Sequence, residues 1–460
     1  MMKKYLSFLL LTFSVFQINA QVAFNMELLG HYDDNTIPSA DESDQKVFND
    51  IWGYAANGRE YALVGSAAYI HFFDVTEPQN PILIDQILGT DTTVWRDIKV
   101  YGTYAYAVSE GNGEGLMIFD LSDLPNSVSL VTRNLDFFEK AHNIFIDENG
   151  KMFVAGTNTL SNGLFVLDLT TDPTQPQMIG NSFLPGGGYV HDVYVKDNLA
   201  YCSHGWNGFY VWDYTNPAQP ILKANLATNG YNHSSWLSED GTYVIFAEEV
   251  PQGLPLGIAD LSLLNAGSIE LAGDYFQFPL LTFDTSFNTP HNPFIKGNYA
   301  FISYYEDGVQ VIDLTDITNP TLAGYYDTFP NNVDYAGYFG CWGVYPFLPS
   351  GNIIATDRKY GLHILNFDET LSSNENLNNN NTFTFFPNPS SNGIFNIKTE
   401  EVTNEKMTIE VTDLSGKKVF EQMLTSTAKE VNLSFLANGF YFGKIIIGDK
   451  EMVKKLVISK

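Results

Sequence analysis

IHFFDVTEPQNP, at residues 70–81, is the first copy of a repeated sequence motif that indicates the fold of this chain. An apolar run leads to an aspartate and then to a Thr and Pro turn, which is typical of a β-strand that ends in a tight turn. Further copies are LMIFDLSDLPNS (116–127), LFVLDLTTDPTQP (164–176), FYVWDYTNPAQP (209–220), LGIADLSLLNAG (256–267), VQVIDLTDITNP (309–320) and the shortened LHILNFDET (362–370).

The polar residue that ends each run recurs at intervals from 45 residues (Asp168 to Asp213) to 53 residues (Asp260 to Asp313). The full series is Asp74, Asp120, Asp168, Asp213, Asp260, Asp313 and Asn366. This spacing suits one four-stranded blade per copy, so the sequence predicts an all-β fold, a seven-bladed β-propeller. Because a carboxylate at a strand end accepts hydrogen bonds from turn N–H groups, we expect these positions to be structural and not catalytic.

The closure of the propeller is a separate prediction. The last repeat ends without an outer strand of its own, while residues 25–32 (NMELLGHY) are similar to residues 320–326 (PTLAGYY), which follow the sixth copy. We therefore expect the N-terminal strand to complete the seventh blade. This pairing would remove an open sheet edge, which is otherwise an aggregation hazard.

The two ends of the chain differ from the repeats. Lys3 and Lys4 precede an apolar run from Leu6 to Ile18, and Ala20 offers a small residue before a cleavage point, which is the pattern of a signal peptide. A retained membrane anchor is the alternative, but the run is short for a span and no transmembrane segment is expected in the mature chain. The predicted organisation is a signal peptide (1–20), a propeller (22–369), an Asn-rich linker (370–382) and a small β-sandwich (383–460).

Composition narrows the possible partners. The net charge of −29, from 53 acidic and 24 basic residues, repels nucleic acids and anionic membranes. It favours solubility or the binding of cations. The two cysteines, Cys202 and Cys341, fall in different repeats, and we expect both to be free, buried thiols.

The repeats also carry a family resemblance. The phrases LMIFDLSD, LFVLDLT and VQVIDLTDITNP resemble LVIVD repeats, which occur in secreted bacterial propellers often labelled choice-of-anchor B proteins. The resemblance covers roughly residues 24–368. It implies an exported propeller paired with a surface anchor, and it implies no agreed reaction.

The C-terminal block carries a second resemblance. Its segments PNP (387–389), VTDLSGK (411–417), ANGFY (437–441) and KKLVI (454–458) are similar, in order and spacing, to the type A C-terminal sorting domain of the type IX secretion system. The resemblance implies that the secretion machinery is a partner and that the protein reaches the outer surface or exterior of a Gram-negative cell. An appended carbohydrate-binding sandwich is the alternative.

Candidate site residues come from aligning the starts of the innermost strands, which should line one mouth of the channel. The ring is Trp52, Arg96, His142, His191, His233, His291 and Trp342. Imidazoles are common ligands of zinc and copper, so the four histidines are candidate metal ligands. Alternatively, each could simply bond a loop of the next blade. Blades one, two and seven have no histidine here, so the fold does not require one.

Loops on the same face add further candidates. Groups that would complete a metal shell or act as bases are Glu110, His204, Glu248, Glu249, Glu306, Asp307 and Asp357. Aromatic rings that would stack on sugars or hold a peptide are Trp95, Phe137, Phe138, Trp206, Tyr231, Phe276, Phe278, Tyr335, Tyr338 and Phe339. The acidic segment 33–44 is a weaker candidate for calcium, since it lacks EF-hand spacing.

Two functions fit these residues. One is an exported binding module whose channel face recognises a glycan, a peptide or a surface protein. The other is an extracellular enzyme with copper or zinc at the histidine ring; a purely architectural role is a third possibility. Because no complete catalytic set can be named, the sequence favours the binding module.

Overall fold

The computed structural model describes residues 23–41, 43, 46–275, 288–330, 335, 337–368, 383–386, 390, 392–399, 407–412, 417–424, 430–447 and 450–458. Within these residues the chain is built of strands, with a single 3-10 turn, η1 (Leu264–Ala266). The expected signal peptide (1–20) and linker (370–382) lie outside the described residues. No helix in the described part of the chain is long and apolar enough to cross a membrane.

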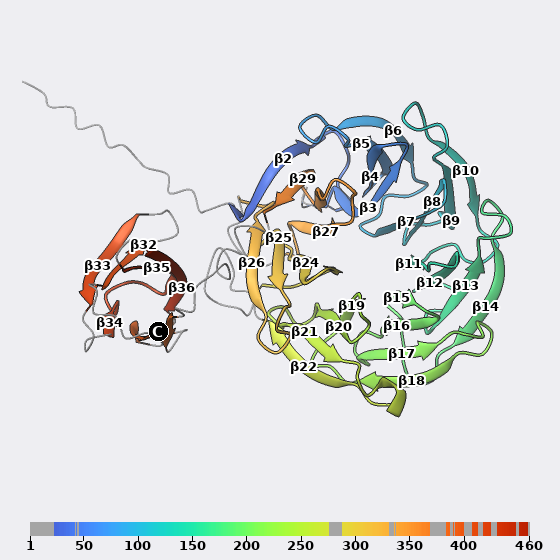
Figure 1. Cartoon of the computed structure of the whole chain (residues 1–460). Helices are drawn as coiled ribbons and strands as arrows, with labels where there is room; N and C mark the ends of the chain where they lie inside the picture. The colour runs from blue at the N-terminus through green and yellow to red at the C-terminus, as the bar shows by residue number, and fades with distance from the viewer. Residues whose placement is uncertain are drawn as a thin grey trace, which may run out of the picture.

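Seven antiparallel sheets, the blades, follow one another around a ring (Figure 1). Blade one holds β3 (Phe48–Ala56), β4 (Arg59–Ser66), β5 (Tyr69–Asp74) and β6 (Ile82–Leu88). Blade two holds β7 (Arg96–Tyr101), β8 (Tyr104–Ser109), β9 (Leu116–Asp120) and β10 (Ser129–Asn134). Blade three holds β11 (Asn143–Ile146), β12 (Lys151–Ala155), β13 (Gly163–Asp168) and β14 (Gln177–Phe183).

The remaining blades repeat this order. Blade four holds β15 (Asp192–Lys196), β16 (Leu199–Ser203), β17 (Phe209–Asp213) and β18 (Ile221–Leu226). Blade five holds β19 (Asn232–Leu237), β20 (Tyr243–Glu248), β21 (Leu256–Asp260) and β22 (Glu270–Tyr275). Blade six holds β23 (Pro293–Lys296), β24 (Tyr299–Ser303), β25 (Val309–Asp313) and β26 (Thr321–Tyr326), with β1 (Ala23–Phe24) added at its outer edge. Blade seven holds β27 (Cys341–Tyr345), β28 (Ile353–Asp357), β29 (Gly361–Phe367) and β2 (Met26–Tyr32).

The innermost strand of each blade packs against that of the next, and β27 packs against β3, so the blades surround a common channel (Figure 1). The hydrophobic cores lie between neighbouring blades: the core shared by blades one and two contains Phe72 and Phe119, whose rings meet edge to face at 5.4 Å. Every blade is therefore stabilised by its neighbours. The expected all-β propeller is confirmed.

The recurring aspartates terminate the third strands as expected. Asp213 Oδ1 accepts a hydrogen bond from the Thr215 N–H at 2.9 Å, and Asp313 makes the same bond with Thr315 at 2.8 Å. Asp74, Asp120, Asp168 and Asp260 do likewise with the N–H two residues ahead. These carboxylates hold the turns that follow the third strands, as expected for a structural role.

The N-terminal strand closes the ring in the expected way. Strand β2 pairs antiparallel with β29, from Met26 opposite Phe367 to Tyr32 opposite Leu362. Asn25, with φ of 51°, turns the chain between β1, on blade six, and β2, on blade seven. The chain ends of the propeller thus meet in one sheet, which leaves no unpaired gap there (Figure 1).

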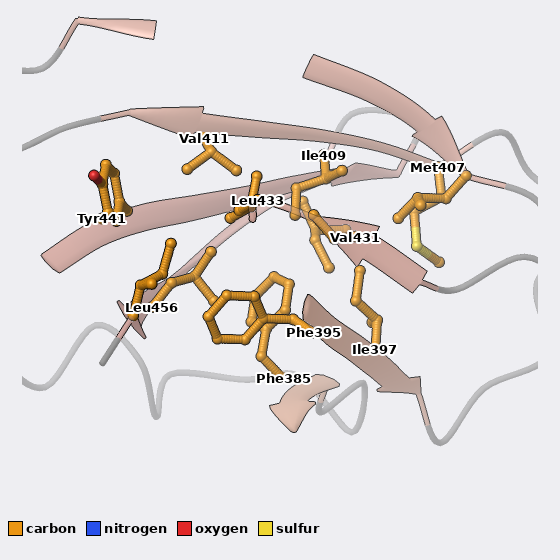
Figure 2. Close-up of a cluster of buried hydrophobic side chains, with 13 residues drawn as sticks. Phe385, Phe395, Ile397, Met407, Ile409, Val411, Val431, Leu433, Tyr441 and Leu456 are labelled. Atoms are coloured by element: carbon orange, nitrogen blue, oxygen red, sulfur yellow. The ribbon is translucent and has the colours of Figure 1, made fainter. Parts of the chain in front are cut away.

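The C-terminal domain is a small β-sandwich with a core of its own. One sheet holds β30 (Phe383–Phe386), β31 (Ile394–Thr399) and β34 (Glu430–Asn432). The other holds β33 (Lys418–Leu424), β32 (Met407–Thr412), β35 (Gly439–Ile447) and β36 (Lys450–Ile458). Phe395, Ile409, Val431 and Leu456 are buried between them (Figure 2).

In the propeller, Cys202 and Cys341 are free and buried, as expected.

Candidate functional site

Four histidines from consecutive blades form an arc at one mouth of the channel. The ring centroids of His142 and His191 are 4.1 Å apart, those of His191 and His233 are 4.2 Å apart, and those of His233 and His291 are 4.4 Å apart. We call these four residues the histidine arc. Residues separated by 42 to 58 positions become neighbours because each stands at the start of its blade's innermost strand.

The arc is held by hydrogen bonds between blades. His191 Nδ1 lies 2.8 Å from the backbone oxygen of His233, and His233 Nδ1 lies 3.2 Å from that of His291. His291 Nδ1 lies 2.6 Å from the backbone oxygen of Trp342. A carbonyl oxygen can only accept, so each Nδ1 must carry the proton and donate it. The tautomer is thereby fixed, and each Nε2 keeps a free lone pair.

Burial keeps these three rings neutral. It lowers the pKa of His191, and the neighbouring charges of His142 and His233 lower it further. Burial also lowers the pKa of His233 and of His291. The three imidazoles therefore offer neutral nitrogen donors at pH 7.

His142, at the end of the arc, is different. Its Nδ1 donates to Glu110 Oε1 at 2.6 Å instead of to a backbone carbonyl. Burial disfavours the charged ring, but the hydrogen bond and the negative charge of Glu110 outweigh it and raise the pKa of His142. One end of the arc is thus the more basic end.

Glu249 brings a carboxylate to the other end of the arc. Its Oε2 lies 3.8 Å from His233 Nε2, and its Oε1 accepts a hydrogen bond from the Tyr305 hydroxyl at 2.5 Å. Ligand atoms of His233, His291 and Glu249 all lie within 4.8 Å of one another. Tyr305 was missed by sequence reasoning, and the only signal for it is its position beside Glu306 in a loop between second and third strands.

Two of the seven residues expected at the channel mouth, Arg96 and Trp342, are held by contacts within the protein. Arg96 is buried, and its guanidinium pairs with Glu114 at 3.1 Å and donates to the Ser66 carbonyl at 2.8 Å. Trp342 lies next to the His291 end of the arc, with its ring 4.5 Å from that of His291 and 4.7 Å from the guanidinium carbon of Arg358. Arg358 is a second residue that sequence reasoning missed.

The alignment was wrong for Trp52. A bulge between Phe48 and Ile51 shifts the register of β3, so that Ile51 opposes Val64 as Ile98 opposes Ala107 in blade two. This correspondence puts Asn49, not Trp52, at the position of Arg96. Trp52 lies deeper, with the Lys99 ammonium 4.5 Å from its ring centre and Tyr345 4.9 Å away. It belongs to an aromatic plug that also contains Phe145, Tyr194, Trp236, Phe294 and Phe347.

A buried polar layer separates the plug from the arc. Lys99 pairs with Asp97, and Asn143 Nδ2 bridges Asp97 at 2.9 Å and Asp192 at 2.8 Å. Burial and the charge of Asp97 raise the pKa of Asp192 to about 7. Asp97 and Asp50 also accept backbone N–H groups of the following blade, from Ile144 at 2.6 Å and Ile98 at 2.8 Å. This layer joins the blades and already contains its own cation.

The loop carboxylates mostly serve the loops themselves. Glu306 accepts the Phe339 N–H at 3.1 Å, and burial raises its pKa to about 7. Asp307 accepts the Tyr335 hydroxyl at 2.7 Å, and Asp357 accepts the Thr328 hydroxyl at 2.8 Å. The other two expected groups are Glu248, which accepts the Gly230 N–H, and His204, which is buried against Tyr210. In the acidic segment 33–44, the described Asp34 and Asp41 hold local turns through Thr36 and Ser43.

The aromatic residues divide between the rim and the seams. Trp206 is 66% exposed and meets Tyr231 edge to face at 5.5 Å, while Tyr231 meets His191 at 5.4 Å. Trp95 is 40% exposed and precedes Arg96 at the same mouth. Phe138, by contrast, is buried in the core between blades two and three. Phe276 and Phe278 lie outside the described residues.

Gly205 fixes the rim loop. Its φ of 54° lies in the left-handed region, and a Cβ at this position would come within 2.6 Å of the Tyr231 ring. Only glycine therefore lets the loop approach Tyr231 closely enough for Trp206 to meet it.

Comparisons with known proteins give matches of low sequence identity among the solved structures. None of the curated proteins matches it. A functionally unknown protein from Desulfotomaculum acetoxidans DSM 771 is 15% identical, with a TM-score of 0.47 over 62% of this chain and 87% of that one. The computationally designed Ika8 protein is 11% identical, with a TM-score of 0.45 over 94% of this chain and 99% of that one.

Family models match both regions that carry a resemblance. The model of the LVIVD repeat matches residues 95–134, 187–228 and 294–328. The model of the secretion system C-terminal sorting domain matches residues 384–459, which include all of the described β-sandwich except Phe383. A sorting domain of this kind directs a protein to the surface or exterior of a Gram-negative cell and implies contact with the type IX secretion machinery. The chain is therefore an exported protein that carries LVIVD repeats and a secretion system C-terminal sorting domain.

Proposed function

We propose that the exported propeller is a binding module that takes an oligosaccharide at its channel mouth. The observation that carries this proposal is Trp206, whose indole is 66% exposed on the rim and is backed by Tyr231. Large aromatic rings left open to solvent in this way provide flat faces for the apolar sides of sugar rings.

The surroundings of Trp206 support a polyhydroxylated ligand. Glu110 and Glu249, which are partly exposed, offer carboxylate acceptors on either side of the arc. Hydroxyl groups are donors that such oxygens can accept, whereas an anionic ligand would be repelled by them and by the net charge of −29.

A Trp206→Ala variant should lose at least about 10-fold in affinity for the bound glycan, because hot-spot aromatics contribute about 2 kcal/mol or more. The measurement is a screen of the mature chain on a glycan array, followed by calorimetry with the best oligosaccharide. Phe183→Ala is the matched control, since Phe183 is 55% exposed on the outer strand β14. Equal affinity of Trp206→Ala and the wild type would contradict the proposal, as would an array that binds nothing.

A further inference from the structure

The end of the histidine arc next to Glu249 has the make-up of a metal site. Ligand atoms of His233, His291 and Glu249 lie within 4.8 Å of one another, and all three residues come from different loops or strands of blades five and six. His233 is 5% exposed and His291 is 1% exposed, so both rings are held in place by packing. The described residues contain no other cluster of this kind.

The histidines are already oriented as ligands. Each donates Nδ1–H to a backbone carbonyl, His233 to His291 and His291 to Trp342, so Nε2 is the nitrogen left to bind an ion. Metal-binding histidines are usually fixed by this outer hydrogen bond, which sets the tautomer and the direction of the ring. No hydrogen bond to either Nε2 is found among the described residues.

The carboxylate is oriented as well. Tyr305 donates its hydroxyl to Glu249 Oε1 at 2.5 Å, which leaves Oε2 directed toward His233 Nε2 at 3.8 Å. Tyr305 is 1% exposed, and its ring lies 4.7 Å from that of His291, so the same residue supports two of the three donors. Glu249 keeps some freedom, because its side chain is 21% exposed.

We propose that His233 Nε2, His291 Nε2 and Glu249 Oε2 bind one divalent transition-metal ion, Zn²⁺ or Cu²⁺, with an open position toward the channel mouth. Two imidazoles and a carboxylate form a common zinc set, and nitrogen donors select against Ca²⁺ and Mg²⁺. Donors about 2.0–2.2 Å from one ion lie roughly 3.4 Å apart in a tetrahedron, so binding needs the widest pair of donors to close by up to about 1.4 Å.

The charged side chains near the proposed site are compatible with a bound cation. The negative charge of Glu249 offsets part of the charge of the ion, and Glu110 lies at the far end of the same arc. The opposing cation is Arg358, which is stacked on Trp342 and donates to the Tyr338 carbonyl at 2.6 Å. The inference goes beyond sugar binding at the rim and does not depend on it.

The test is calorimetric titration of the mature chain, without a polyhistidine tag and after treatment with EDTA, with Zn²⁺ and separately with Cu²⁺. We expect one equivalent to bind with a Kd below about 1 µM for at least one ion. His291→Ala should weaken binding by at least about 100-fold, and Glu249→Gln by about 10- to 100-fold. His31→Ala, which changes an exposed histidine on β2, should leave binding unchanged.

The variants also keep the two proposals separate. Glu249→Gln changes a partly exposed residue, so it keeps the test valid if His291→Ala fails to fold. Trp206→Ala should lose the glycan and keep the ion. Absence of binding by both ions, or the same affinity in wild type, His291→Ala and Glu249→Gln, would overturn the metal site. Neither of these results would affect the glycan proposal.

Discussion

A chain that lacks residues 22–33 is expected to be insoluble or to melt at a much lower temperature than the full protein. The deletion removes β1 and β2, and with β2 the six residue pairs that join it to β29. It also removes Met26 from the core between blades six and seven. At about 0.5–1.5 kcal/mol for each hydrogen bond, the ladder alone contributes on the order of 5 kcal/mol, and its loss exposes the edge of β29.

The solubility of the expressed protein and its thermal melting curve measure this effect. A chain that ends at residue 382 is the control, because the core of the β-sandwich contains no propeller residue, and its propeller should melt as in the full protein. Adding a peptide of residues 22–33 should restore part of the lost stability. A soluble truncated chain with an unchanged melting temperature would refute closure by β2.

Replacement of Arg96 by methionine should destabilise the protein by about 3–5 kcal/mol, because the buried Glu114 loses its fully buried cation and keeps only the partly exposed Arg133, at 2.9 Å. The guanidinium of Arg96 pairs with Glu114 and donates to the carbonyls of Ser66 and Asp91, at 2.8 and 3.1 Å. It thereby ties blade one to blade two. The free energy of unfolding in urea is the quantity to measure.

Two further variants test whether the loss of stability comes from the buried ion pair. Arg59→Met breaks the ion pair of a half-exposed arginine with Asp74, whose carboxylate keeps the hydrogen bond from the Thr76 N–H, and its effect should be clearly smaller than that of Arg96→Met. The double variant Arg96→Met/Glu114→Gln should recover part of the loss, since it removes the buried carboxylate that Arg133 alone would have to balance. If Arg96→Met were as stable as the wild type, Arg96 would not be a structural residue.

Most of the fold could be predicted because short sequence motifs that specify strands and turns recur along the chain. Apolar runs that end in aspartate or asparagine specify a strand and its turn seven times, five of them with a following proline. The similarity of residues 25–32 to residues 320–326 identifies the closing strand. The positions of all four arc histidines followed from the same alignment, since each stands at or just before the start of an innermost strand.

The errors and omissions have physical causes. Trp52 was misplaced because the bulge near Phe48 adds residues that an alignment of apolar positions does not detect. The role of Arg96 depends on Glu114, in the loop before β9 of the same blade, and the repeat pattern does not mark that position. The hydrogen bonds that fix the tautomers go to backbone carbonyls of other blades, and a sequence does not show which carbonyl a ring will meet.

The state of the histidine arc can be measured directly. Long-range ¹H–¹⁵N spectra of the metal-free mature chain, labelled with ¹⁵N-histidine, report which ring nitrogen carries the proton. Three rings, His191, His233 and His291, should have protonated Nδ1 and bare Nε2, and each should titrate below the ordinary histidine value because burial lowers its pKa. Protonated Nε2 in these rings, or ordinary titration near pH 6.5, would contradict an arc that presents free lone pairs at the channel mouth.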